Sequence, residues 1–273
     1  MASNFVIDPV KKSILIKLVE SGKNTMLTGS TGCGKTTLCV EIAKELNLNP
    51  IVINCGSTQD ARSSLLGYFT LDNGTTIFQD ADFLKAIQQE NTLIILDELS
   101  RASDDAYNII FPLLDFRKEI RVDEKEDGRV VKIAKNVKFI ATANIGVEYS
   151  SARSIDRALQ DRFLSFNIPY LKGSKVKSYV KKQFDAETAD LASPIFKIYD
   201  YTHKMFEEGK LSDRLSTRMV LEVMPLMKDF TVADVLDNVI LSLFQQDSSA
   251  ILNDANIIRE YADSLGVYNK TTS

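Results

Sequence analysis

The chain has 273 residues, of which 44% are hydrophobic and 26% are charged, and its formal net charge is −4 at pH 7. This is the composition of an ordinary globular protein, and the length suits one large domain or one medium and one small domain. The acidic balance argues against a protein that coats nucleic acid or an anionic membrane, although it is compatible with a local basic groove.

Targeting and metal-binding signals are missing from the sequence. No apolar run is long enough to cross a bilayer, and the first five residues lack the basic start and apolar core of a signal peptide. The three cysteines, Cys33, Cys39 and Cys55, lack C-x-x-C spacing, and the single histidine, His203, lies far from them. This pattern argues against a disulfide framework and a zinc site. We therefore expect a cytoplasmic protein with reduced thiols and no membrane contact.

A phosphate-binding loop is predicted near the start of the chain, after a helix over 9–22. Residues 29–36 read G-S-T-G-C-G-K-T, which fits the P-loop pattern. Its glycines let successive N–H groups face phosphate oxygens, and the start of the following helix adds partial positive charge. Lys35 would reach the β- and γ-phosphates, and the Thr36 hydroxyl would bind Mg²⁺. The predicted nucleotide-binding residues are Gly29, Ser30, Thr31, Gly32, Cys33, Gly34, Lys35, Thr36 and Thr37.

The surroundings of this loop have the expected alternation of strand and helix. A β-prone segment over 25–28 precedes the loop, and apolar residues at helical spacing follow it. A second strand is predicted over 50–54, and its nearly unbroken apolar run predicts cover on both faces. Residues 68–78 favour two short strands around an Asp-Asn-Gly turn, before a helix over 81–90. This hairpin is either a neutral surface insertion or a functional loop, and the residues alone favour neither.

Two carboxylates follow the most apolar strand of the sequence. Residues 92–98 read T-L-I-I-L-D-E, which predicts a buried central strand with Asp97 and Glu98 at its carboxyl end, where open α/β sheets bind ligands. Asp97 would hold Mg²⁺, directly or through water, and Glu98 would act as general base or orient the attacking water. Because acidic pairs after strands are often only solvated turn residues, the catalytic interpretation depends on the P-loop.

The next segment contains a helix, a hairpin and a third core strand. A helix is predicted over 103–116, with a kink or break at Pro112. Alternating residues on both sides of an acidic loop predict a hairpin over 119–133 that projects into solvent. The strand over 137–144 ends in Asn144, whose amide would hold the attacking water or the γ-phosphate, or would only cap the following turn.

Arginines precede the last predicted strand, over 164–168. Arg153, Arg157 and Arg162 are either solvated surface charges or candidates for an arginine finger that acts on a neighbouring subunit. Beyond Pro169 only helices are predicted, over 174–184, 187–208, 216–228, 231–245 and 249–264. The predicted fold class is α/β: a P-loop NTPase with a five-stranded parallel sheet flanked by helices, plus a C-terminal all-helical lid. The boundary near residue 170 gives an α/β nucleotide-binding domain over 1–170 and a helical domain over 171–273.

Five segments in order resemble an AAA+ ATPase: G-S-T-G-C-G-K-T, L-I-I-L-D-E, F-I-A-T-A-N, A-L-Q-D-R-F and L-S-T-R. More narrowly, the chain is similar to the MoxR/CbbQ-type branch, which is related to the dynein and McrB modules. The resemblance implies that Asp97 and Glu98 are the Walker B acids and that Asn144 is sensor 1. Asn54 matches a position that in some relatives restrains the Walker B glutamate until a partner engages.

The same resemblance implies a site shared between subunits. Arg162 would be the finger that reaches the neighbour's γ-phosphate, with Arg157 as second choice, and Arg218 would be sensor 2 from the lid. The resulting assembly would be a homo-oligomeric ring, with six as the expected number of subunits. In this branch an insertion and a hairpin face the pore of the ring, and residues 68–78 and 119–133 match them.

The function implied is ATP hydrolysis with Mg²⁺ that remodels or activates a protein client or adaptor, such as a von Willebrand A-type protein. The alternative is a nucleic-acid-linked AAA+ ATPase of replication, restriction or a mobile element. The acidic hairpin tip over 123–127 argues against the alternative because it would repel phosphates. Two departures from the family pattern are the unusual Cys33 in the P-loop and the lack of an added substrate-recruiting domain.

Overall fold

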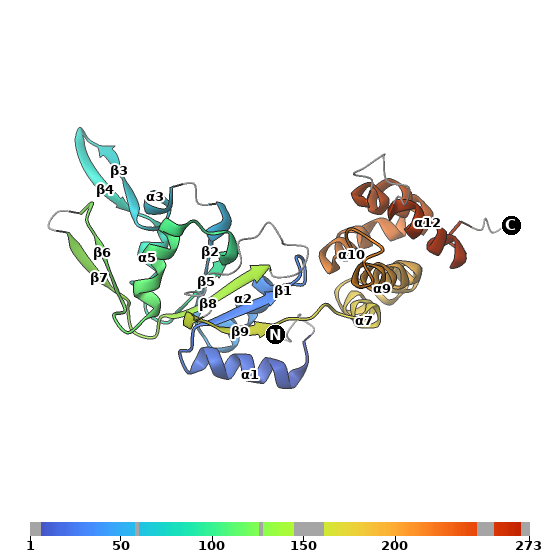
Figure 1. The fold of residues 1–273 in the computed structure, drawn as a ribbon, viewed down its shortest axis with the longest axis horizontal. Helices are drawn as coiled ribbons and strands as arrows, with labels where there is room; N and C mark the ends of the chain where they lie inside the picture. The colour runs from blue at the N-terminus through green and yellow to red at the C-terminus, as the bar shows by residue number, and fades with distance from the viewer. Residues whose placement is uncertain (1–6, 58–59, 126–127, 145–160, 245–253, 269–273) are drawn as a thin grey trace. The chain divides into compact units, whose positions relative to one another are not determined.

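The computed structural model of the chain is shown in Figure 1, and it describes residues 7–57, 60–125, 128–144, 161–244 and 254–268. The chain divides into two compact units, one formed mainly by residues 7–169 and the other mainly by residues 170–273. Within the described residues, no helix combines the length and the apolar character needed to cross a membrane.

The first unit is built on a five-stranded sheet in which every neighbouring pair of strands is parallel. Its order is β2-β5-β8-β1-β9, so β8 lies between the strand that leads into the P-loop and the strand that ends in the acidic pair. Because all strands run the same way, their carboxyl ends share one edge. The strands are β1 (Thr25–Gly29), β2 (Asn49–Asn54), β5 (Thr92–Asp97), β8 (Lys138–Asn144) and β9 (Leu164–Asn167).

Helices flank this sheet, and the predicted α/β fold class is confirmed (Figure 1). Helix α1 (Pro9–Glu20) begins where the Asp8 carboxylate accepts from the N–H groups of Val10 and Lys11. Helix α2 (Lys35–Glu45) follows the P-loop directly. Helix α5 (Asp104–Leu114) begins at Ser103, whose hydroxyl accepts from the Ala106 N–H.

Of the predicted kink or break at Pro112, the break is wrong. Helix α5 runs through the proline and ends two residues later at Leu114. A proline in the last turn removes only one N–H···O bond from the helix, and six buried side chains anchor the rest of α5 in the core.

Strand β2 is also less buried than its apolar run predicts. It lies at the edge of the sheet, where β5 is its one partner among the described strands, and the Val52 side chain is 46% exposed. In β5, by contrast, all residues from Thr92 to Leu96 are buried. An apolar run therefore identified the strand correctly, but it did not distinguish an edge position from a central one.

The first predicted hairpin is present. Strands β3 (Gly67–Asp72) and β4 (Thr75–Asp80) pair antiparallel, with Asp72 opposite Thr75. The two loop residues, Asn73 and Gly74, have φ angles of 48° and 81°, as a type I′ turn requires. The helix that follows, α4 (Asp82–Ala86), is shorter than the predicted one over 81–90.

The second hairpin consists of β6 (Glu119–Val122) and β7 (Arg129–Lys132), and it does not simply project into solvent. The side chains of Ile120, Val122 and Val131 are buried in the core that also covers the central sheet. Alternation along the strands gives the hairpin one buried and one exposed face, so it is attached to the unit along its length. Figure 1 shows both hairpins at the same end of the unit.

Among its described residues the second unit contains helices and loops but no strand, and it has its own core. The predicted helix over 187–208 is two helices, because Pro194 is accommodated in the first turn of α9 and not in a helix interior. The part of the last predicted helix before Asp254 lies outside the described residues. The α-helices are α7 (Gly173–Gln183), α8 (Ala186–Leu191), α9 (Ser193–Glu207), α10 (Thr217–Val223), α11 (Val232–Val235) and α12 (Asp254–Ser264).

Candidate nucleotide-binding and catalytic site

The P-loop connects β1 to α2 along the carboxyl edge of the sheet. Gly32 and Gly34 have φ angles of 73° and 85°, a region that residues with a side chain rarely adopt. These two glycines give the loop its curl, and the loop ends at the amino terminus of α2. Backbone N–H groups and the positive end of a helix dipole therefore face the same place, which is the physical basis of phosphate binding.

Lys35 is the first residue of α2 and is only 7% exposed. Its ammonium group donates to the carbonyl oxygens of Gly29 at 3.0 Å and Ser30 at 2.8 Å, and to Asn144 Oδ1 at 2.8 Å. The contact with Asn144 follows from the sheet, because the register places Gly29 beside Asn144 at the ends of β1 and β8. The structure thus brings together the predicted phosphate-binding lysine and the predicted sensor amide.

The two predicted metal ligands also meet. Thr36 Oγ1 donates to Asp97 Oδ1 at 2.7 Å. Hydroxyl and carboxylate oxygens are the hard donors that Mg²⁺ prefers, and Mg²⁺ usually takes one or two protein oxygens and completes its shell with phosphates and water. The described residues contain no cluster of three or more acidic, histidine or cysteine ligands. This donor set fits Mg²⁺ bound together with a nucleotide, and it does not fit a metal enclosed by protein ligands alone.

Glu98 turns the chain out of β5 with a φ angle of 53°, which is unusual for a glutamate. Arg101 Nη1 donates to Glu98 Oε2 at 3.1 Å, a contact that the sequence analysis missed. Within the described residues, Asn54 makes no hydrogen bond with Glu98, and its side-chain oxygen instead accepts from the Gly56 N–H at 3.0 Å. The structure therefore does not show the expected contact between Asn54 and Glu98. Arg101 contacts the Glu98 carboxylate instead.

Thr142 is a second residue that sequence reasoning missed. Its hydroxyl donates to Asp97 Oδ1 at 2.6 Å and accepts from the Glu98 N–H at 3.0 Å. A signal for it exists in the sequence, because Thr142 is a polar residue inside a core strand, next to Ala141 and Ala143.

The cysteines near this site are buried free thiols. Burial raises the pKa of the Cys55 thiol to about 12, and the negative charge of Asp97 acts in the same direction. The same two causes raise the pKa of Cys39. Because the thiolate is the reactive form, these side chains are inert packing residues and not nucleophiles.

The structure describes two of the predicted arginines, Arg162 and Arg218. The guanidinium carbon of Arg162 lies 4.3 Å from the centre of the Phe111 ring of α5, and the side chain is half-buried. Arg218 is an exposed residue at the start of α10 in the second unit. Arg153 and Arg157 lie outside the described residues. The finger and sensor roles of these arginines remain predictions.

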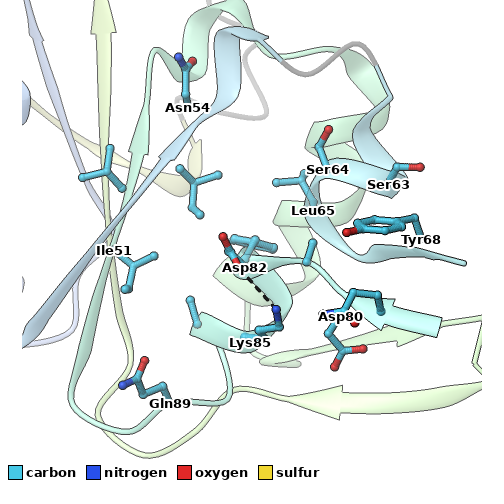
Figure 2. A pocket seen from close by; sticks show the side chains of 16 residues that line it. Ile51, Asn54, Ser63, Ser64, Leu65, Tyr68, Asp80, Asp82, Lys85 and Gln89 are labelled. Atoms are coloured by element: carbon cyan, nitrogen blue, oxygen red, sulfur yellow. Dashed lines mark hydrogen bonds and ion pairs between the residues drawn. The ribbon is translucent and has the colours of Figure 1, made fainter. Parts of the chain in front are cut away.

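A separate cavity of about 720 Å³ lies along the free edge of β2, and Figure 2 shows the side chains that line it. It is bounded by β2, α3 (Ala61–Leu65), the hairpin of β3 and β4, and α4. Lys35, Asp97 and Asn144 are not among its lining residues, so this cavity is distinct from the P-loop site.

Together, a P-loop, an acidic pair and a polar strand end at the carboxyl edge of a parallel sheet define a nucleotide-binding site of the P-loop class. The family model described as "AAA domain (dynein-related subfamily)" matches residues 24–163, which is half of the chain. The chain therefore belongs to the dynein-related subfamily of AAA domains.

The chain is also similar to bacterial proteins in sequence and in structure. Uncharacterized proteins of Staphylococcus epidermidis and Staphylococcus aureus are 27% and 25% identical over 244 residues, covering 86% of this chain and 90% of each relative. The crystal structure of NtrX from Brucella abortus in complex with ADP matches with a TM-score of 0.59 at 15% identity, over 94% of this chain. This chain spans about three fifths of the NtrX chain, 61% of its length, and the likeness shows a shared fold.

Proposed function

We propose that this chain is a Mg²⁺-dependent ATPase of the MoxR/CbbQ type that works in a homo-oligomeric ring and remodels or activates a protein partner. The main support is the convergence of Lys35, Asn144, Thr36 and Asp97 within hydrogen-bond distance at one sheet edge. Membership of the AAA family supports nucleotide binding, and ADP in the related NtrX structure is consistent with it.

The chain's own groups suit in-line hydrolysis of the γ-phosphate. The P-loop N–H groups and Lys35 would bind the phosphates, and Asn144 would orient the water or the γ-phosphate. Glu98 would accept a proton from the water as its oxygen bonds to phosphorus and the bond to the β-phosphate oxygen breaks, which releases ADP. Thr36 and Asp97 would hold Mg²⁺, which supplies positive charge against the phosphate oxygens. The salt bridge with Arg101 must open or rotate before both oxygens of Glu98 are free for this role.

A ring follows from the proposed finger. An arginine that completes the neighbour's site leaves each monomer with an incomplete site, so hydrolysis depends on assembly. Arg162 is a suitable finger because the ring of Phe111 holds its guanidinium against α5 and limits its freedom.

The exposed side chains of the first hairpin favour a protein partner. Tyr68, Phe69 and Leu71 in β3 are 53%, 58% and 73% exposed, and Ile77 in β4 is 39% exposed. Exposed apolar residues gathered on one hairpin are typical of contacts with protein and offer nothing to a phosphate backbone.

The acidic tip of the second hairpin is a weaker argument than the sequence indicates. Arg62 binds both carboxylate oxygens of Glu124, at 2.5 and 2.9 Å, and Arg121 donates to Asp123 at 2.6 Å. The charges of Asp123 and Glu124 are therefore balanced within the chain. A second cavity of about 530 Å³ lies between α5 and this hairpin, and Arg62, Arg117 and Arg121 line it. The contacts above occupy Arg62 and Arg121, and Arg117 donates to Asp115 at 2.7 Å, so these arginines offer little free positive charge to nucleic acid.

The test is a steady-state ATPase assay on the purified chain with Mg²⁺, compared with Glu98→Gln and Lys35→Ala. Glu90→Gln is a matched control because Glu90 is an exposed residue before β5. We expect hydrolysis by the wild type and the control, and loss of at least 10²-fold in the two site variants. Absence of Mg²⁺-dependent turnover in the wild type at every protein concentration would refute the proposal.

Assembly and partner are tested with the Glu98→Gln variant, which would bind ATP without cleaving it. Mass photometry with Mg·ATP should detect a ring, and a monomer at micromolar concentration would contradict the finger argument. Stimulation of hydrolysis by DNA, falling steeply with salt, would favour the nucleic-acid alternative. The von Willebrand A-type partner and the cytoplasmic location remain parts of the proposal.

A further inference from the structure

Thr142 is a buried hydroxyl in the middle strand of the site. Strand β8 lies between β1 and β5, and Thr142 is 2% exposed between two alanines that are fully buried. Placing a hydroxyl in such a position costs free energy unless it makes hydrogen bonds. Thr142 makes two, and both go to the acidic pair at the end of β5.

The register of the sheet explains this contact. Leu96 of β5 pairs with Ala141 of β8. The next residues, Asp97 on β5 and Thr142 on β8, therefore lie side by side. Thr142 is also the residue paired with Leu27 on β1, and it therefore connects the strand of the P-loop to the strand of the acidic pair.

The direction of both hydrogen bonds is determined by chemistry. The backbone N–H of Glu98 can only donate, so Thr142 Oγ1 accepts from it at 3.0 Å. The single hydroxyl hydrogen is then available for Asp97 Oδ1, 2.6 Å away, and an ionised carboxylate can only accept. If the Thr142 hydrogen pointed anywhere else, the Asp97 carboxylate would lose this donor. The hydroxyl therefore has one favourable orientation.

Asp97 is consequently held from two sides. Its Oδ1 accepts from the Thr36 hydroxyl at 2.7 Å and from Thr142 at 2.6 Å. Within the described residues, Oδ2 of Asp97 makes no hydrogen bond. This arrangement orients the carboxylate toward Thr36, the other proposed ligand of Mg²⁺.

Glu98 is held at its backbone by the same hydroxyl. Its φ angle of 53° is an unfavourable conformation for a residue with a long side chain and needs support from neighbouring groups. The bond from its N–H to Thr142 provides that support at the point where the chain leaves β5.

We propose that Thr142 is a positioning residue for ATP hydrolysis, which orients the Asp97 carboxylate toward Thr36 and Mg²⁺ and fixes the backbone from which Glu98 reaches the water. The inference rests on the proposed ATPase function. The Thr142 hydroxyl thereby links Asp97, the proposed metal ligand, to Glu98, the proposed base. Its hydrogen holds the Asp97 carboxylate, and its lone pair holds the Glu98 N–H.

Substitutions separate the hydroxyl from its packing. Thr142→Val keeps the shape of the side chain and removes both hydrogen bonds, whereas Thr142→Ser keeps the hydroxyl and removes a methyl group. Thr92→Val is the matched control, because Thr92 is a fully buried threonine at the opposite end of β5 whose hydroxyl makes one long contact, 3.4 Å, with the Glu90 carbonyl. If Thr142→Val fails to fold, the pair Thr142→Ser and Thr142→Ala makes the same comparison.

Two readouts are measured: kcat with KM, and the affinity for a fluorescent ADP analogue with Mg²⁺ or with EDTA. We expect Thr142→Val to lower kcat by about 10- to 100-fold, the equivalent of lost hydrogen bonds to a charged group. Its affinity in EDTA should equal that of the wild type, because the P-loop is intact, while the gain in affinity on adding Mg²⁺ should shrink by about tenfold. Thr142→Ser should regain activity to within about threefold of the wild type.

The outcomes distinguish this inference from the proposed function. If the wild type does not hydrolyse ATP, the proposed function fails and the Mg²⁺-dependent affinity alone decides the role of Thr142. If the wild type is active and Thr142→Val keeps its kcat and its response to Mg²⁺, the inference is overturned. It is also overturned if a folded Thr142→Ser is as inactive as Thr142→Val, or if Thr92→Val shows the same losses.

Discussion

His203, the single histidine of the chain, predicts a loss of stability in mild acid. It is 2% exposed in the core of the second unit, where Nε2 lies 3.0 Å from the Leu215 carbonyl oxygen and the rings of Tyr170 and Tyr199 pack against it. Among the described residues Nδ1 has no hydrogen-bond partner. Burial, and secondarily the positive charge of Arg214, lowers the pKa of His203 to about 4, although the Leu215 carbonyl acts in the opposite direction.

The size and sign of the effect follow from this pKa. In the unfolded chain a histidine has a pKa of about 6.5, so between about pH 6.5 and 4 the unfolded state binds more protons than the folded state. The contribution of His203 to the free energy of unfolding is therefore highest above about pH 6.5, and it decreases as the pH falls toward 4. A pKa lowered from 6.5 to about 4 corresponds to about 3 kcal/mol in the free energy of unfolding, of which about 2 kcal/mol is lost by pH 5.

The assay uses the fact that only one imidazole is present. An NMR titration should show a single histidine signal that titrates near pH 4, and urea unfolding of the second unit should lose about 2 kcal/mol between pH 7.5 and pH 5. His203→Gln is the control: it should be less stable at pH 7.5 and should lack this loss. The carboxylate of Asp185 does not interfere, because its pKa is lowered to about 2 and it titrates below this window. A histidine pKa near 6.5, or equal losses in wild type and variant, would refute the reasoning.

Three further predictions concern the site. Asn144→Ala removes the side-chain acceptor of Lys35 and should lower kcat by about 10- to 100-fold, with a smaller change in nucleotide affinity measured by fluorescence. Arg101→Ala releases Glu98 from a partly exposed ion pair and should raise the basal ATPase rate up to about fivefold; a lower rate would mean that Arg101 assists catalysis. The Cys55 thiol should react with a thiol reagent at pH 8 only on unfolding, and fast labelling of the native protein would contradict its burial.

Features set by neighbours in the chain were predictable from the sequence. The turn at Asn73-Gly74 was found because two positive φ angles need these residue types, and the pairing of Asp72 with Thr75 follows from a two-residue loop. The P-loop and the helix after it are local in the same way, since glycines, lysine and helix start occupy consecutive positions.

Features set by the order of the strands were not predictable from the sequence. The edge position of β2 depends on which strand lies beside it, and its apolar residues do not carry that information. The contact of Thr142 with Asp97 needs β8 to lie beside β5 in one register, because the two residues are far apart in the chain. The buried face of the second hairpin likewise depends on packing against the rest of the unit.

The contact of Arg101 with Glu98 shows why a short separation in the chain is not enough. The two residues are three positions apart, and they meet because Glu98 adopts a left-handed conformation before the single 3₁₀ turn Leu99–Arg101. A regular strand end would have turned the two side chains differently. The unusual conformation of Glu98 is therefore needed for the pairing, and its residue type gives no hint of it.

Glu98 is held by two contacts of opposite character, and the difference indicates where control of hydrolysis would act. At the backbone, its N–H binds the buried Thr142 hydroxyl, a contact that solvent and salt do not easily disturb. At the carboxylate, the side chain is 32% exposed and its Arg101 partner 59% exposed, and a pair of this kind contributes up to about 1 kcal/mol. Gly56 leaves room for this carboxylate, since an added Cβ would lie 2.8 Å from Glu98 Oε2. In the proposed ring, a fixed backbone with a weakly held side chain would let a neighbouring subunit or partner move the Glu98 carboxylate for little free energy, without disturbing Asp97 or its proposed contact with Mg²⁺.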